Sequence, residues 1–214
     1  MNLIITDFDG TLFDKNYKKN IEAIKKIKNT DIIIATGRNY ESLKKDLQIK
    51  CKYYICNDGG YILDEKENII YKNYFNEENI KRIYRRLKKL NYDNYFFDYI
   101  NTLDKKIENN INKLSLKIRD NNAINDMKYL LNGINDVYGY LSENWINILP
   151  ISSKKENAID YILKNNNYDK VWVIGNEIND YKMIKKYNGF LITDIEIGDY
   201  NCTKNFLETI DKLN

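Results

Sequence analysis

The sequence predicts an α/β protein: a Rossmann-like, doubly wound parallel sheet that is interrupted by a small inserted α+β domain. Short, fully apolar strands alternate with helical patterns at both ends of the chain, and three of these strands run into polar turns. In the middle of the chain the order changes to helix–strand–strand, repeated twice. Fully apolar strands joined by helices are typical of a parallel sheet that is covered on both faces.

The N-terminal part supplies the first three strands. Apolar strands are expected at residues 3–6, 32–35 and 52–56. The two helices between them are predicted from apolar residues at helical spacing: Ile21, Ala23, Ile24 and Ile27 in the first, and Tyr40, Leu43 and Leu47 in the second.

The same alternation returns near the C-terminus. A helix over residues 154–163 would present Ala158, Ile159, Ile162 and Leu163 on one face. An apolar strand follows at residues 171–175, and another helix is expected from residue 179. These segments complete the predicted parallel sheet.

The middle of the chain is predicted to form a separate domain. Helices are expected at residues 77–90 and 123–131, and strands at residues 95–100, 113–120, 136–142 and 145–150. This order indicates an antiparallel sheet with its helices on one face. We therefore predict a core of residues 1–75 and 150–214, with an insertion over residues 76–149.

The composition limits the chemistry and the partners. The chain has no His, which excludes Ser–His–Asp and Cys–His mechanisms and His-based zinc sites. A net charge of only +3 argues against nucleic acid and membrane partners. The cysteines are Cys51, Cys56 and Cys202, an odd number without a CxxC pair, which indicates reduced thiols. Without a membrane-length apolar run or a signal-peptide layout, we expect a cytoplasmic protein.

Two side-chain patterns in the insertion each allow two interpretations. The basic residues of the first helix form either a nucleic-acid surface or, as we expect from the low net charge, a solvated face. They are Lys81, Arg82, Arg85, Arg86, Lys88 and Lys89. The aromatic residues after it either stack on a substrate ring or, as we expect, form the core of a small sheet. They are Tyr92, Tyr95, Phe96, Phe97 and Tyr99.

The polar turns after the strands are the candidate site. They read Asp7-Phe8-Asp9-Gly10-Thr11, Thr36-Gly37-Arg38 and Gly175-Asn176-Glu177-Ile178-Asn179-Asp180. Ligand sites in open parallel sheets form outside the carboxyl ends of the strands, so these turns are expected to converge. Asp7 and Asp9 would share a face and repel each other, a cost that Mg²⁺ removes. The alternative is a pair of solvated or capping aspartates.

Four segments resemble the ordered motifs of the haloacid dehalogenase (HAD) superfamily, in particular its Cof-like sugar-phosphatase branch. They are DFDGTL, IIIATGR, the Lys of KENAIDYIL and GNEINDYKMI, and they extend from residue 7 to residue 184. That branch carries its cap domain between the second and third motifs, where the insertion is predicted here.

The resemblance implies catalytic roles for four residues. Asp7 would be the nucleophile that carries an aspartyl-phosphate, and Asp9 the general acid and base. Thr36 would donate a hydrogen bond to a phosphoryl oxygen, although it could instead cap the helix that follows. Lys155, rather than its neighbour Lys154, would stabilise the transferred phosphoryl group, because the family places an Ala three residues after this Lys.

The resemblance also implies the metal ligands. Mg²⁺ would be held by Asp7, the backbone carbonyl of Asp9, Asn176 and Asp180. The family usually has an Asp where this chain has Asn176, and an uncharged amide would lower the affinity for the metal. Asn176 could equally be a turn former after Gly175.

Substrate-side residues are predicted from the same motifs. Thr36, Gly37, Asn57, Lys155 and Asn179 make up this set. Asn57 belongs to an Asn-Asp-Gly-Gly turn that either lines the substrate entrance or is only a turn. We expect Asn179 to orient Lys155 or Asp180.

The resemblance implies a Mg²⁺-dependent phosphatase that acts on a small phosphomonoester, such as a sugar phosphate, with the insertion as a lid. One alternative is a phosphomutase, which passes the phosphoryl group to an organic acceptor. Another is a metal-poor binding or regulatory protein on the same fold, suggested by Asn176. The sequence identifies neither the substrate nor the oligomeric state.

Overall fold

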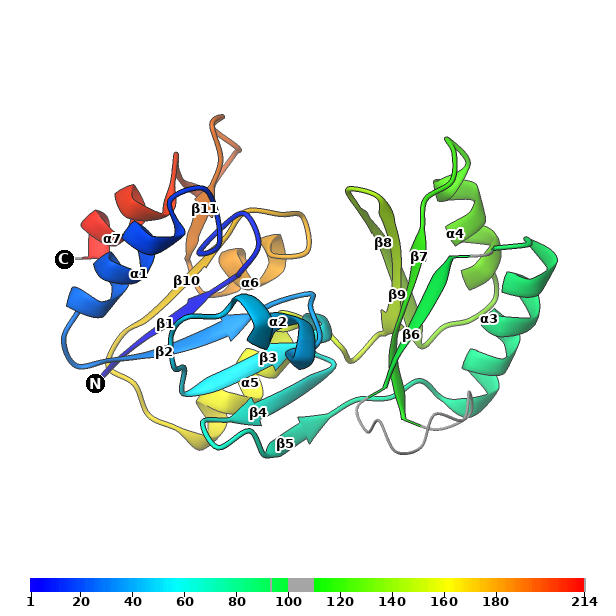
Figure 1. Ribbon diagram of the computed structural model, residues 1–214, viewed down its shortest axis with the longest axis horizontal. Helices are drawn as coiled ribbons and strands as arrows, with labels where there is room; N and C mark the ends of the chain where they lie inside the picture. Colours follow the sequence, from blue (N-terminus) through cyan, green and yellow to red (C-terminus); the bar gives the residue numbers. More distant parts are fainter. Residues whose placement is uncertain (93, 100–109, 214) are drawn as a thin grey trace. The chain divides into compact units, whose positions relative to one another are not determined.

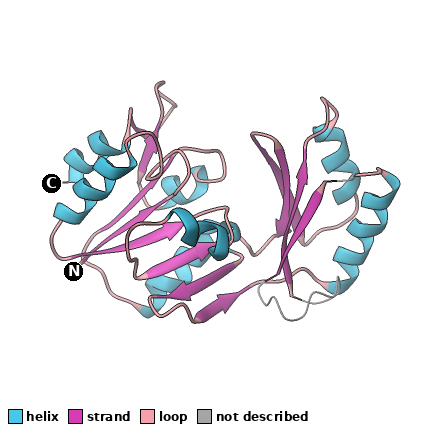
Figure 2. Ribbon diagram, in the orientation of Figure 1, coloured by secondary structure: helices cyan, strands magenta, loops and turns pink. Residues whose placement is uncertain are grey.

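The computed structural model describes residues 1–92, 94–99 and 110–213. The chain divides into two compact units, one formed by Met1–Tyr71 with Lys155–Asn214 and the other by Lys72–Lys154. The predicted insertion, residues 76–149, falls within the second unit. Each unit has its own sheet (Figure 2).

The first unit is built on an eight-stranded sheet with the order β12-β11-β10-β1-β2-β3-β4-β5. Strands β12 to β3 in this order pair in parallel, and β4 is antiparallel to β3. The strands are β1 (Asn2–Thr6), β2 (Thr30–Ala35), β3 (Tyr53–Cys56), β4 (Tyr61–Asp64), β5 (Ile69–Lys72), β10 (Val171–Gly175), β11 (Phe190–Ile192) and β12 (Asn201–Thr203).

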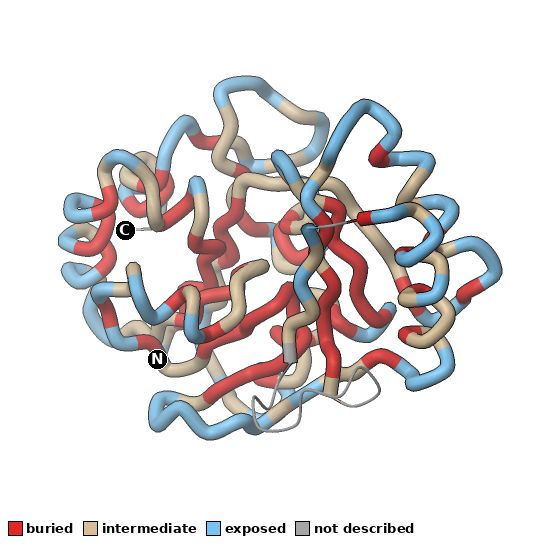
Figure 3. The backbone as a smooth tube through the Cα atoms, turned by 45° about the vertical axis from the view of Figure 1, so that its right-hand side comes forward, coloured by how far each residue is buried: buried red, intermediate tan, exposed pale blue. Residues whose placement is uncertain are grey.

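Helices cover both faces of this sheet (Figure 2). They are α1 (Tyr17–Lys26), α2 (Tyr40–Asp46), α5 (Lys155–Asn165), α6 (Tyr181–Lys186) and α7 (Phe206–Leu213), with a 3₁₀ turn, η1 (Asn57–Gly59). On one face, Leu3 and Ile5 of β1 share a core with Ile159 of α5. Helices α1 and α7 lie side by side (Figure 1), and the central strands are buried (Figure 3). The doubly wound prediction is confirmed.

The second unit is a four-stranded antiparallel sheet with the order β6-β7-β9-β8. Its elements are α3 (Glu77–Lys89), β6 (Tyr95–Tyr99), β7 (Ile111–Lys117), α4 (Ala123–Leu131), β8 (Val137–Ser142) and β9 (Trp145–Pro150). Ile83 of α3 and Leu130 of α4 pack in one core with Leu114 and Ile146 of the sheet. The predicted helix–strand–strand repeat is therefore present.

The aromatic residues near β6 mostly belong to this core. Tyr92 is buried, and Tyr95 and Phe97 pack against the cluster, as the core interpretation predicts. Phe96 is 58% exposed, because alternate residues of a strand point to opposite faces. The side chain of Tyr99 lies outside the described residues. On α3 the buried residues are Ile80, Ile83 and Leu87, and none of the basic residues is among them. Both interpretations of the basic residues place them away from the core, so the solvated face stays a prediction.

Several elements were not predicted from the sequence. Strands β11 and β12 have three residues each, and β5 is largely exposed, so none shows a readable period. Helix α6 begins at Tyr181 rather than residue 179, because the preceding residues fold into a loop around Asp180. No helix among the described residues combines the length and apolarity that a membrane span needs.

Candidate active site

A tight turn follows β1 and carries the two predicted catalytic aspartates. The Phe13 N–H donates to the Phe8 carbonyl at 2.7 Å, and the Gly10 N–H donates to the Phe13 carbonyl at 3.0 Å. Gly10 has a left-handed backbone (φ +72°), and a Cβ there would lie 2.5 Å from Nδ2 of Asn176. Glycine thus serves both the turn and its close approach to the loop after β10.

The loop after β10 folds around the carboxylate of Asp180. Oδ2 of Asp180 accepts the N–H groups of Asn176 at 3.0 Å and Glu177 at 3.1 Å. A Cβ on Gly175 would lie 2.6 Å from Asp180 Cγ, so only glycine leaves room for this carboxylate. The Thr11 hydroxyl donates to Asn176 Oδ1 at 2.8 Å, which joins the loop to the β1 turn.

Lys155 lies between two carboxylates. Its Nζ donates to Asp7 Oδ1 and to Asp180 Oδ1, both at 2.7 Å. The side chains of Lys155, Asp7 and Asp180 are 1%, 8% and 0% exposed. The adjacent Lys154 instead has its Nζ 5.7 Å from the centre of the Tyr138 ring. The structure therefore brings Lys155 to the predicted nucleophile.

Burial and charge shift the pKa values of this cluster in competing ways. Burial lowers the pKa of Lys155, but the carboxylates of Asp180 and Asp7 outweigh it, so the net pKa lies above its ordinary value. Burial raises the pKa of Asp7 to about 8, with Lys155 lowering it and Asp180 raising it. A further cation near Asp7 would favour the ionised carboxylate that a nucleophile needs.

The turns after β2 and β3 are joined to each other. The Asp58 N–H donates to the Thr36 carbonyl, and the Asn57 N–H to the Arg38 carbonyl, both at 2.9 Å. The Thr36 hydroxyl accepts the N–H of Arg38 at 3.1 Å. The N-cap of α2 is Asn39, so Thr36 is not the cap of that helix. Gly37, between Thr36 and Arg38, lies in the same turn.

Asp58 is a buried acid that the sequence analysis did not assign to the site. It is 1% exposed. Burial lowers the pKa of Lys155, and the charge of Asp58 adds to the larger contributions of Asp180 and Asp7 that raise it. Asn179 Nδ2 donates to Asp58 Oδ1 at 3.0 Å. The signal for Asp58 was an acidic residue in a turn directly after a buried strand.

Asp9 is held by an arginine that was also not assigned. Arg38 Nε donates to Asp9 Oδ2 at 2.8 Å, and Arg38 Nη2 donates to Asp9 Oδ1 at 2.5 Å. Arg38 Nη1 donates to Asp46 at 2.6 Å. These hydrogen bonds to Asp9, followed by those to Asp46, raise the pKa of Arg38. The side chains of Arg38, Asp9 and Asp46 are 23%, 47% and 42% exposed.

A family model described as haloacid dehalogenase-like hydrolase matches residues 4–102 and 91–191. The chain belongs to the haloacid dehalogenase-like hydrolase family. This confirms the resemblance inferred from the four motifs. An uncharacterized protein from Mycoplasma capricolum is 26% identical to this HAD-like chain over 206 residues, covering 89% of this chain and 74% of the relative.

Solved structures of similar fold support the architecture of this HAD-like chain. A haloacid dehalogenase-like hydrolase from Bacteroides thetaiotaomicron matches with a TM-score of 0.78 and 18% identity, covering 100% of this chain and 99% of that one. A sucrose-phosphatase from Synechocystis, solved with sucrose and phosphate, matches with a TM-score of 0.71 and 16% identity, covering 99% and 95%. At these identities the likeness shows the fold.

Several oxygens of the predicted metal ligands in this HAD-like chain already accept hydrogen bonds from the protein. Both oxygens of Asp180 accept hydrogen bonds from protein groups, so direct ligation by Asp180 stays a prediction. Within residues 1–92, 94–99 and 110–213, no three His, Cys, Asp or Glu side chains form a metal-binding group. The Asn176 amide oxygen also accepts the Thr11 hydroxyl, and Asp7 Oδ1 accepts Lys155 Nζ, so ligation by these residues stays a prediction too. The Asp7 carboxylate, the Asn176 amide oxygen and the Asp9 carbonyl are nevertheless oxygen donors of the kind that Mg²⁺ takes, one or two carboxylates with waters and phosphate.

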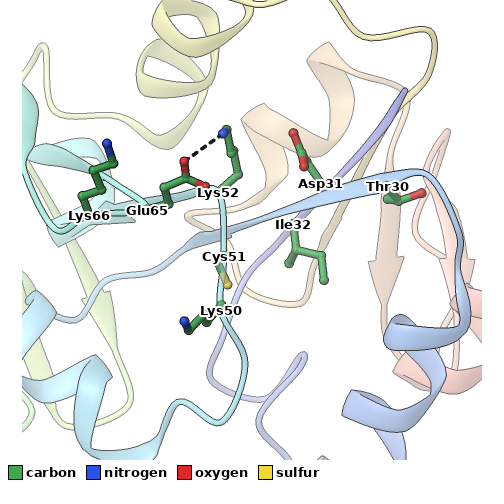
Figure 4. A pocket seen from close by; sticks show the side chains of 8 residues that line it. All are labelled: Thr30, Asp31, Ile32, Lys50, Cys51, Lys52, Glu65 and Lys66. Carbon is green, nitrogen blue, oxygen red and sulfur yellow. Dashed lines mark ion pairs between the residues drawn. The ribbon is translucent and has the colours of Figure 1, made fainter.

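A hollow of about 410 Å³ lies at the opposite, amino ends of β2 and β3 (Figure 4). It is lined by Thr30, Asp31, Ile32, Lys50, Cys51, Lys52, Glu65 and Lys66. Lys52 and Glu65 form an ion pair of 3.2 Å across part of it (Figure 4). None of the predicted site residues lines this hollow, and it is separate from the candidate active site.

Proposed function

We propose that this HAD-like chain is a Mg²⁺-dependent phosphatase that hydrolyses a small phosphomonoester through an aspartyl-phosphate on Asp7. The observation that carries this proposal is the buried ammonium of Lys155, 2.7 Å from both Asp7 and Asp180. Burying three charged groups at the carboxyl ends of parallel strands costs free energy. Such clusters of shifted pKa values are typical of catalytic sites.

Hydrolysis would proceed by two displacements. In the first, an Asp7 oxygen attacks phosphorus, the bond from phosphorus to the leaving oxygen breaks, and Asp9 gives that oxygen a proton. In the second, water attacks phosphorus and gives a proton to Asp9. The bond between phosphorus and Asp7 then breaks, and its electron pair returns to the Asp7 carboxylate.

The remaining residues would bind and orient the phosphoryl group. Lys155 offsets the negative charge of the phosphoryl oxygens, and Asp180 fixes the direction of Lys155. The Thr36 hydroxyl accepts a hydrogen bond from Arg38, so its own proton remains available for a phosphoryl oxygen. Gly37, Asn57 and Asn179 stay in the proposal as residues beside the substrate.

Asp7, Asn176 and the Asp9 carbonyl would hold Mg²⁺. When bound, the ion supplies positive charge that offsets the phosphate and favours in-line geometry. The fold likeness to a sucrose-phosphatase supports a sugar phosphate as the substrate class.

Phosphate release from an aryl phosphate tests the proposal. The wild-type protein should release phosphate in millimolar Mg²⁺, and Asp7→Asn should lose turnover by at least about 10³-fold, because the amide is a poor nucleophile. Full turnover by Asp7→Asn would show that another group attacks phosphorus.

A metal-poor binding protein is the second candidate, favoured by Asn176 in place of an acid. Titration of Mg²⁺ with phosphate release as the readout separates the two. In this second case the wild-type protein shows neither metal binding nor turnover, while Asn176→Asp gains both, because a second carboxylate raises the affinity for a hard cation.

A further inference from the structure

We infer that Arg38 is a positioning residue that acts on the reaction through Asp9. The inference rests on the proposed phosphatase function and names a residue to which the sequence motifs gave no role. Arg38 belongs to the turn after β2, whereas Asp9 belongs to the turn after β1. The guanidinium therefore links the proposed proton carrier to a second strand of the sheet.

The contact is a fork that meets both carboxylate oxygens. Nε and Nη2 of Arg38 each donate to a different oxygen of Asp9, at 2.8 Å and 2.5 Å. Two parallel hydrogen bonds fix the plane of the carboxylate as well as its distance, which one hydrogen bond does not. Rotation of Asp9 about its side-chain bonds breaks both contacts at once, so Arg38 selects one orientation.

Arg38 is itself held on three sides. Its third nitrogen, Nη1, donates to Asp46 at 2.6 Å. Its guanidinium carbon lies 5.1 Å from the ring centre of Phe8 and 5.5 Å from that of Phe13. These two rings stack on each other with centroids 4.9 Å apart. Because Phe8 and Phe13 belong to the same turn as Asp9, this packing sets the guanidinium relative to the turn.

The arrangement is better explained by positioning than by stability. The ion pairs are partly exposed, and exposed ion pairs contribute little to the free energy of unfolding. The fork nevertheless meets the one carboxylate proposed to carry the proton, and an ion pair and two aromatic contacts hold the guanidinium that makes the fork. A lysine would keep the charge but lose the fork, so it cannot reproduce this geometry.

The test combines a double-mutant cycle with two leaving groups. Arg38→Met, Asp9→Asn and the double variant are compared with the wild-type protein on an aryl phosphate and on an alkyl phosphate. The value of kcat/KM reports on the first displacement, in which an alkoxide needs a proton and a phenolate with a low pKa does not. Proton transfer of this kind is worth about 10²–10⁴-fold.

We expect Arg38→Met to lower kcat/KM about 10–100-fold for the alkyl phosphate, as misplacement of a catalytic group does. For the aryl phosphate the loss should be below about threefold. In the Asp9→Asn background, Arg38→Met should change neither value by more than about twofold, because the two residues act as one unit.

Two further variants serve as controls for charge and for general effects on the fold. Arg38→Lys keeps the positive charge and should show the same pattern as Arg38→Met, even if Arg38→Met folds poorly. Arg119→Met is the matched control in the other unit, since Arg119 also stacks on a ring, Tyr92 at 3.9 Å, and pairs with Asp126 at 3.6 Å. Its kcat/KM should stay unchanged on both substrates.

Equal losses of kcat/KM on both leaving groups would overturn the inference. The same holds if Arg38→Met causes its full loss of kcat/KM in the Asp9→Asn background, because Arg38 would then contact the substrate or support the fold directly. In that case the wild-type protein is still a phosphatase. A wild-type protein that releases no phosphate from either substrate would instead end the proposed function, and this inference with it.

Discussion

Two clusters of the site each place one cation between two carboxylates, and they differ in their exposure to water. In the first, Lys155 bridges Asp7 and Asp180, and all three side chains are at least nine-tenths buried. In the second, Arg38 bridges Asp9 and Asp46, and the two carboxylates are 47% and 42% exposed.

The difference corresponds to what each carboxylate is proposed to do. A nucleophile must meet phosphorus along one line, so Asp7 gains from a buried, rigid setting. A proton carrier must exchange its proton during each turnover, so Asp9 gains from access to water. The same arrangement of one cation between two carboxylates therefore occurs twice, once in the buried core and once at the surface.

Removal of the buried cation should have the largest effect on stability. Lys155→Met removes the cation from two buried carboxylates, so we expect the free energy of unfolding to fall by about 3–5 kcal/mol in denaturant titrations. Lys154→Met is the matched neighbour and should change it by less than about 0.5 kcal/mol. Equal effects of the two variants would remove the distinction between the clusters.

The close approach of the β1 turn to the loop after β10 gives a smaller, measurable effect. Gly10→Ala suffers both from the left-handed backbone and from the 2.5 Å approach to Asn176, so a loss of roughly 2–4 kcal/mol is expected. Gly198→Ala has a similar backbone (φ +46°) with no atom within 4 Å, so it should show only the backbone cost of about 1 kcal/mol. A Gly10→Ala variant as stable as Gly198→Ala would contradict the contact.

The exposed cluster should yield the smallest change. Asp46→Asn removes one of the two carboxylates at Arg38, and the unfolding free energy should fall by less than about 1 kcal/mol. Because salt screens exposed charges, that difference should shrink in roughly 1 M salt, whereas the effect of Lys155→Met should persist. A loss of unfolding free energy that does not change with salt concentration would mean that Arg38 and Asp46 are more deeply buried than in this structure.

The sequence predicted those features that depend on local pattern. Apolar strands ending in polar turns gave the parallel sheet, and the turns at Asp7, Thr36 and Asp180 led to the candidate site. Three-residue strands such as β11 carry too few residues for a period and were missed.

The partners of the charged side chains could not be predicted in the same way. Arg38 belongs to one of the polar turns predicted from the sequence. Its two hydrogen bonds to Asp9 nevertheless depend on the register between β1 and β2, which only the folded sheet fixes. Likewise, the pairing of Asp180 with Lys155 and two backbone N–H groups depends on how the loop after β10 closes.

The central claim is that Asp7 carries the phosphoryl group during turnover. Acid quenching of the wild-type protein during turnover of a phosphomonoester in Mg²⁺, followed by peptide mass analysis, tests it directly. The account predicts a phosphorylated peptide that contains Asp7, labile to hydroxylamine and missing in Asp7→Asn. Steady turnover with no phosphorylated peptide, or with the phosphoryl group on a different residue, would contradict it.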